Sequence, residues 1–262
     1  MGAFSAFFQT GNPMFAKNSL RKFYLRSISI NPSQIERYLR LIMILLSLVA
    51  GIVFFLGRDW VTLASAILCI FLLAIPPLFN RLSHFNIPLP FRFIYLGFIF
   101  TSMYLGELHS FFYRFGWWDD LLHTCSAMML AYCALILAHI LNKDKQIADG
   151  LLPAFLALFI LTFTMGFGAV WELFEFVMDR LLGVNMLKGR DPRDLSGIYD
   201  NGRALVNTMQ DLILDLSGGL FISILSFYQL RKRILYKSGF GYLLRVFLAE
   251  NQGLIKRGLR PD

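Results

Sequence analysis

The sequence predicts an all-α protein with six transmembrane helices, and two observations predict this fold: the composition of the chain and the length of its apolar segments. Of the 262 residues, 56% are hydrophobic, 27 are Phe and only 16% are charged. In an ordinary water-soluble domain about a quarter of the residues are charged. The composition therefore excludes a soluble globular enzyme and indicates a polytopic membrane protein.

Six apolar segments are each long enough to cross a hydrocarbon core, which takes about 20 helical residues. Lipid offers no water to the backbone polar groups, so each segment is expected to be a helix. Pro76 and Pro77 are expected to end or kink the second helix, because proline lacks the N–H group of the helical ladder. The segments cover residues 38–57, 60–80, 91–111, 121–142, 151–178 and 207–230.

Basic residues flank the apolar segments and predict the orientation of the chain. Residues 1–36 mix apolar side chains with Lys and Arg, which is typical of an amphipathic segment on an anionic leaflet. Residues 37–232 form the expected transmembrane domain, and residues 233–262 form a basic tail. Lys and Arg are enriched in cytoplasmic loops, so both termini are predicted to be cytoplasmic. The outer loop, residues 184–205, breaks this rule because it is also basic.

Nine ionisable residues lie in or beside the apolar segments. A charge at the centre of a membrane helix costs about 2.5–3.5 kcal/mol on insertion scales, so such residues indicate a functional site unless they are paired or hydrated. The nine residues are Glu107, Asp119, Asp120, His123, Glu172, Glu175, Asp179, Asp211 and Asp215.

Topology and spacing predict that these acids meet. Glu107, His123, Glu172 and Asp215 each lie about 16 to 20 residues from the expected cytoplasmic helix ends, or about 24–30 Å at 1.5 Å per residue. Within one helix the polar residues recur at spacings of three, four or seven, which places them on a single face. Carboxylates avoid lipid, so these faces are expected to turn inward and form one pocket on the outer side.

The third and fourth helices share a polar pattern with the fifth and sixth. In each hairpin the outgoing helix carries a Glu, and the returning helix carries an Asp followed four residues later by His or Asp. The first hairpin has Glu107, Asp119 and His123, and the second has Glu172, Asp211 and Asp215. Both hairpins run in the same sense, so the pattern predicts a parallel repeat. The match is short, and a chance similarity is the alternative.

Carboxylates with a single imidazole suit a hard or borderline divalent metal, which here means Mg²⁺, Mn²⁺, Zn²⁺ or Fe. The expected metal ligands are His123, Glu172, Asp211 and Asp215. The candidate catalytic groups are Glu107, Asp119 and Glu175. Two alternatives stay open: a proton or ion relay, and a carboxylate network that only holds the helices together.

Three short motifs carry a resemblance to known families. They are Trp118-Asp-Asp-Leu-Leu-His123, Trp171-Glu-Leu-Phe-Glu175 and Asp211-Leu-Ile-Leu-Asp-Leu-Ser-Gly-Gly219. With them the chain resembles the YjdF-like family of bacterial inner-membrane proteins, and the order of the motifs is similar to that of VanZ-like membrane proteins. The resemblance covers roughly residues 90–225. It implies a multi-pass protein of the bacterial inner membrane with these polar positions at its centre, and it implies no particular activity.

The first functional hypothesis is a metal-dependent hydrolase or transferase that acts at the outer leaflet on a lipid-linked phosphate or a similar anionic headgroup. A bound metal would polarise the phosphoryl oxygen and activate water or an acceptor hydroxyl. The guanidinium fork of Arg suits the remaining phosphate oxygens. The residues expected to bind the substrate are Arg190, Arg193 and Arg203 of the basic outer loop.

Two other functions compete with this hypothesis. A transporter for a divalent cation or protons needs a polar route to the cytoplasmic side, whereas the inner halves of the last four helices are rich in Phe, Leu and Ile. A non-catalytic subunit of a membrane complex is the third function, and it alone predicts a membrane-protein partner. Membrane lipid is the partner expected from the first, and no nucleic-acid partner is expected.

Overall fold

The computed structural model describes residues 31–83, 85–141, 153–191 and 196–257. The chain divides into two compact units, residues 1–43 and residues 44–262, and the features discussed below lie in the second unit. The described residues form helices and no strand, and six helices are long and apolar enough to span a membrane, which confirms the expected fold class. The amphipathic segment predicted before residue 31 lies outside the described residues.

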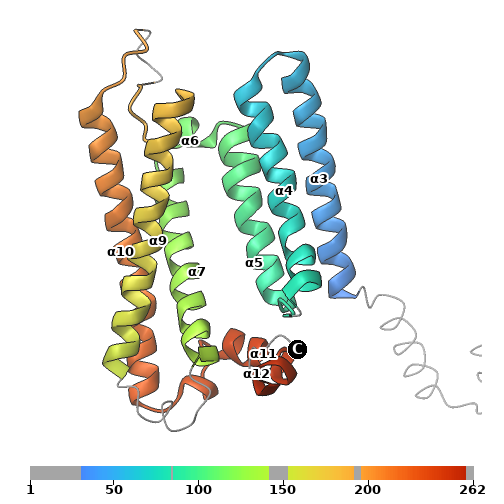
Figure 1. Cartoon of the computed structure of the whole chain (residues 1–262), viewed down its shortest axis with the longest axis vertical. Helices are drawn as coiled ribbons and strands as arrows, with labels where there is room; N and C mark the ends of the chain where they lie inside the picture. Colours follow the sequence, from blue (N-terminus) through green and yellow to red (C-terminus); the bar gives the residue numbers. More distant parts are fainter. Residues whose placement is uncertain (1–30, 84, 142–152, 192–195, 258–262) are drawn as a thin grey trace, which may run out of the picture. The chain divides into compact units, whose positions relative to one another are not determined.

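The membrane-spanning helices run close to the expected positions (Figure 1). They are α3 (Pro32–Leu56), α4 (Trp60–Ser83), α5 (Leu89–Ile99) continued by the π-helix η1 (Phe100–Leu108), α7 (Trp118–Leu141), α9 (Pro153–Leu182) and α10 (Asn201–Arg231). Four short elements complete the described part: α6 (Phe111–Arg114), the 3₁₀-helix η2 (Leu235–Lys237), α11 (Tyr242–Glu250) and α12 (Gln252–Arg257).

Two helix ends differ from the sequence expectation for local reasons. α9 continues to Leu182, and the chain then leaves the helix at Gly183, whose φ of 65° suits a residue without Cβ. α10 begins at Asn201, several residues before the expected start, because the carboxylate of Asp200 caps it by accepting hydrogen bonds from the amides of Gly202 and Arg203. Both acidic helices are therefore longer than their apolar segments.

The prolines of α4 do not end that helix, which continues for six residues beyond Pro77. Pro76 has no N–H to donate to the carbonyl of Leu72, four residues earlier. The hydroxyl of Tyr95 on α5 donates to this carbonyl at 2.9 Å instead. A side chain of the neighbouring helix thus satisfies the freed backbone acceptor, as lipid-buried helices require.

The closest packing in the second unit joins α7, α9 and α10, which lie side by side in Figure 1. Gly218 on α10 lies against α7 so closely that a Cβ at this position would be 2.7 Å from the carbonyl oxygen of Thr124. Gly219 lies against Thr164 of α9 in the same way. A Cβ at position 219 would be 3.2 Å from Thr164 Cγ2. Small residues therefore bring the three helices close enough for their polar faces to meet.

An apolar core fills the end of this bundle farther from the loop between α9 and α10. Leu135 of α7, Ile160 of α9 and Ile222 of α10 pack there against Leu235 and Leu244 from the C-terminal elements. The hydroxyl of Tyr132 donates to the carbonyl of Phe240 at 2.7 Å and accepts from the amide of Leu244 at 3.1 Å. The sequence predicted a basic tail for the C-terminal segment. In the structure this segment also packs against the apolar core.

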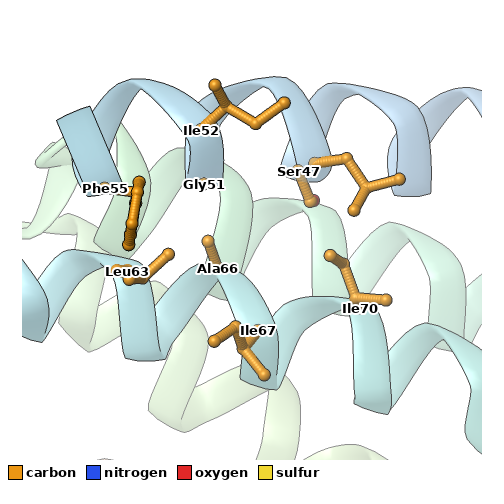
Figure 2. Close-up of a pocket in the computed structure, with 9 residues that line it drawn as sticks. Ser47, Gly51, Ile52, Phe55, Leu63, Ala66, Ile67 and Ile70 are labelled. Carbon is orange, nitrogen blue, oxygen red and sulfur yellow. The ribbon is translucent and has the colours of Figure 1, made fainter.

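An apolar groove of about 340 Å³ lies between α3 and α4 (Figure 2). Gly51 allows the two helices to approach, since a Cβ built on it would be 3.6 Å from Ala66 Cβ. Ser47 is the polar side chain in the lining, and its hydroxyl donates to the sulfur of Cys69. The groove carries no charged group, so its surface suits lipid acyl chains and lies apart from the acidic residues.

Candidate metal site

The polar faces of α7, α9 and α10 are buried against one another. On each helix the acids lie on the same face as the other buried residues. Examples of these residues are Ala127 on α7 and Thr164 and Gly168 on α9. The helical spacing predicted this arrangement, and it holds for three of the four helices that carry acids. The buried ionisable residues of these three helices, each at most 7% exposed, are His123, Glu172, Glu175, Asp179, Asp211 and Asp215.

Three of the side chains offer ligand atoms that converge. One ligand atom each from Asp119, His123 and Asp211 lie within 4.8 Å of one another. His123 Nε2 is 4.0 Å from Asp119 Oδ1 and 3.9 Å from Asp211 Oδ2. Two oxygens and one nitrogen at these separations form a donor set of the kind that binds divalent metals.

The other ring nitrogen of His123 faces a different carboxylate. Nδ1 lies 3.4 Å from Asp215 Oδ1, while Nε2 faces Asp119 and Asp211. Metal-binding histidines usually have such a carboxylate or carbonyl behind the ring, because it keeps the proton on the far nitrogen and frees the near one for the metal. Asp215 therefore lies where it would orient His123, rather than beside the other two ligand atoms.

Two buried carboxylates near this group are incompletely satisfied. Asp211 is fully buried, and within the described residues its Oδ1 accepts no hydrogen bond. Glu172 is 5% exposed, and neither of its oxygens accepts a hydrogen bond of standard geometry there, although Thr208 and His123 are close enough to stabilise its charge. Leaving a charged group unpaired costs more than about 1–3 kcal/mol, so these oxygens indicate a missing cationic partner.

The remaining two acids of α9 have partners. Glu175 Oε1 accepts a hydrogen bond from the indole of Trp171 at 3.0 Å. Asp179 accepts from the amides of Met186 and Leu187, at 2.7 and 3.2 Å, and from the hydroxyl of Tyr199 at 3.0 Å. These hydrogen bonds to Asp179 hold the loop between α9 and α10 against the end of the bundle.

Lys188 is a residue of the site that the sequence did not single out. Its ammonium lies 2.8 Å from Asp119 Oδ2, 3.4 Å from the carbonyl of Met186, and 4.9 Å above the ring of Phe112. Burial lowers the pKa of Lys188, but Asp119, with smaller contributions from Glu175 and Tyr113, raises it, and the net pKa is raised, so the side chain stays cationic. Its φ of 54° is unusual for a residue with Cβ. No spacing rule predicts a cation in a loop.

Tyr199 completes the loop and keeps its proton. Burial and the neighbouring Asp179 carboxylate raise the pKa of Tyr199 to about 12. The hydroxyl therefore continues to donate to Asp179 at any physiological pH. Gly189 packs against the same ring, where a Cβ would be 2.5 Å from its edge. The segment around Lys188 is consequently held from both sides.

The other predicted site residues lie apart from the three converging ligands. Arg190 donates to the carbonyls of Gly183 and Val184 and stacks on Tyr199. Arg203 pairs with Asp191 at 2.9 Å. Arg193 lies outside the described residues.

Glu107 is exposed, although it stays within electrostatic range of Lys188 and Asp119. It lies in η1, where the π-helical turn replaces the 3.6-residue period on which its inward position was predicted. The helix formed by α5 and η1 therefore adds no buried acid to the site.

Comparison with known proteins identifies a family but no close relative. Neither the search of curated proteins nor the search of solved structures found a match for this chain. A family model described as "Predicted membrane protein (DUF2238)" matches residues 35–232. The matched segment contains the whole of the α7–α9–α10 bundle and every candidate site residue. The chain therefore belongs to the DUF2238 family of membrane proteins.

Proposed function

We propose that this protein binds one divalent metal ion through Asp119, His123 and Asp211 and uses it to act on a lipid-linked phosphate or a similar anionic headgroup. The observation that carries the proposal is the convergence of these three ligand atoms within 4.8 Å in a buried bundle. The unpartnered oxygens of Asp211 and Glu172 support it, because a cation would satisfy them. Asp215, behind the imidazole, supports the assignment of His123 as a ligand.

The proposed location is the bacterial inner membrane, with both termini in the cytoplasm and the metal site in the outer leaflet. The distribution of Lys and Arg supports this orientation. The resemblance of the three polar motifs to YjdF-like proteins, and of their order to VanZ-like proteins, supports the bacterial inner membrane. In this arrangement residues 37–232 form the transmembrane domain, with the amphipathic segment 1–36 and the tail 233–262 on the cytoplasmic side.

The proposed chemistry is hydrolysis of a phosphate monoester or transfer of its phosphoryl group. A metal bound by Asp119, His123 and Asp211 would polarise the phosphoryl oxygen. In hydrolysis, Glu172 takes a proton from water, the water oxygen forms a bond to phosphorus, and the bond from phosphorus to the lipid oxygen breaks. Glu175 or Glu107 supplies the proton that the departing lipid oxygen takes up. Arg203 lies in the first turn of α10, its side chain is 48% exposed, and it can exchange Asp191 for a phosphate oxygen. Arg190 and Arg193 belong to the loop that precedes α10.

The apolar core favours this reading over transport of a cation or protons. A transported ion needs polar groups along the whole bundle, whereas Leu135, Leu156, Ile160 and Ile222 pack together between the acids and the opposite helix ends. A polar site at one end of the bundle suits binding and chemistry at one membrane face. A non-catalytic subunit of a membrane complex is the outcome that remains if the metal binds but no turnover follows.

A turnover assay tests the proposed chemistry. The protein is placed in nanodiscs that contain phosphatidic acid, with Mn²⁺ or Zn²⁺, and the release of inorganic phosphate is measured. We expect release that a chelator abolishes and that Glu172→Gln lowers by about 10²-fold or more, since general base catalysis contributes about 10²–10⁴-fold. Glu250→Gln, an exposed change of the same kind on α11, serves as the control. Metal binding without any phosphate release would contradict the enzymatic function.

A further inference from the structure

The two carboxylates of the proposed site each accept a hydrogen bond from a second residue. Lys188 Nζ lies 2.8 Å from Asp119 Oδ2, which leaves Oδ1 to face His123. Asn207 Nδ2 donates at 2.8 Å to Asp211 Oδ2, the oxygen that lies 3.9 Å from His123 Nε2, and Asp211 Oδ1 has no hydrogen bond among the described residues. Asp215 Oδ1 lies 3.4 Å from the far nitrogen of His123. Each of the two carboxylates thus has one oxygen held by a donor from another residue.

Asn207 is well placed for this task. It precedes Asp211 by four residues on α10, so the two side chains lie on one helical face. The amide nitrogen must face Asp211, because the opposite orientation would set a carbonyl oxygen against a carboxylate. One donor of Asn207 therefore fixes the rotation of the Asp211 carboxylate.

Lys188 is held more firmly than a surface lysine. Asp179 accepts the amides of the two residues before it, and Tyr199 packs on the residue after it. Its ammonium donates to Asp119 Oδ2 and to the carbonyl of Met186, and it lies over the ring of Phe112. Lys188 therefore acts on the site through Asp119.

We propose that Lys188 and Asn207 are positioning residues that restrict Asp119 and Asp211 to one ligand oxygen each. This inference rests on the proposed metal site. A metal held by two single oxygens and one nitrogen has three protein ligands, so its remaining coordination positions are open to water or to a substrate oxygen. Sites with three protein ligands and an open position are typical of catalytic metals, whereas structural zinc sites have four protein ligands.

Titration with Mn²⁺ alone tests the role of the two residues. Lys188→Met and Asn207→Leu remove the donors, and each is expected to weaken Mn²⁺ binding by about 10–100-fold, the usual effect of losing a group that orients a metal ligand. Lys188→Arg should recover most of the affinity. Water-proton relaxation of bound Mn²⁺ should show fewer coordinated waters in Lys188→Met and Asn207→Leu, because the freed carboxylates can bind through both oxygens.

The direction of the Lys188→Met effect is diagnostic. Removing a positive charge near a cation site would by itself tighten cation binding, so unchanged or tighter binding would overturn the proposal. Arg114→Gln removes the same charge from an exposed position of α6 without touching Asp119, and Gln210→Leu makes a similar change to Asn207→Leu at an exposed position of α10. Both controls should bind Mn²⁺ like the unaltered protein.

The inference can fail separately from the proposed metal site. If Asp211→Asn loses Mn²⁺ but Lys188→Met and Asn207→Leu bind it like the unaltered protein with the same number of waters, the metal site stands and the positioning role is wrong. If Asp211→Asn also binds Mn²⁺ normally, the metal site itself is wrong. Thermal unfolding in the presence of chelator identifies a variant that does not fold. If Lys188→Met or Asn207→Leu does not fold, the milder substitution Lys188→Gln or Asn207→Ser takes its place in the titration.

Discussion

Replacing Asp211 with Asn is expected to weaken divalent metal binding by about 10³-fold. Asp211 is fully buried, and one of its oxygens has no other partner among the described residues. A unit charge 4 Å from another contributes about 4 kcal/mol at an effective dielectric constant of 20, which corresponds to about 10³ in affinity. Isothermal titration of the detergent-purified protein with Mn²⁺ measures the change.

The metal-free fold should survive this substitution. Asn keeps the shape of Asp and removes a charge that is costly to bury, so unfolding in the presence of chelator should occur at or above the temperature of the unaltered protein. Asp120→Asn is the matched control, because Asp120 is the exposed neighbour of Asp119 on α7. Equal loss of metal binding in both variants would mean that general charge, and not the buried ligand, attracts the cation.

Gly218→Val is expected to remove metal binding without touching a ligand. A Cβ at this position would be 2.7 Å from the carbonyl oxygen of Thr124 and 2.9 Å from Ala127 Cβ. Since α7 carries both of these atoms, α7 and α10 must move apart, which separates His123 from Asp211. Overpacking of this kind costs about 1–3 kcal/mol, and the substitution should lower both the unfolding temperature and the Mn²⁺ affinity.

Gly166→Val provides the matched control for this experiment. Gly166 lies in the interior of α9, where a Cβ would meet nothing within 4 Å. The two substitutions change helix propensity alike, so any difference between them reports packing. Metal affinity that falls equally in both variants would show that the contact of α7 with α10 does not set the geometry of the site.

Much of the site could be predicted from the sequence because helical spacing decides which residues share a face. The inward rows of α9 and α10, from Glu172 to Asp179 and from Asp211 to Asp215, follow from spacings of three and four. Spacing does not tell which oxygen faces which nitrogen. The sequence placed Asp119 among the catalytic groups and Asp215 among the ligands, whereas the geometry groups Asp119 with His123. Which of these acids bind metal stays a prediction.

Other features could not be predicted because they depend on contacts outside the helical period. Glu107 was expected to point inward, but the π-helix that carries it breaks the 3.6-residue register. Lys188 reaches Asp119 through a loop whose course is set by Asp179 and Tyr199. The proposed parallel repeat also stays a prediction, and η1 has no counterpart in α9, which is α-helical throughout.

The most direct test of the metal site is pulsed electron paramagnetic resonance of Mn²⁺ bound to the purified protein. If His123 is a ligand, one Mn²⁺ per chain should show coupling to a nitrogen nucleus, and the coupling should disappear in His123→Gln. His109→Gln, which changes an exposed histidine, should leave it intact. Bound Mn²⁺ without nitrogen coupling, or the absence of bound Mn²⁺ after gentle purification, would contradict a site built on Asp119, His123 and Asp211.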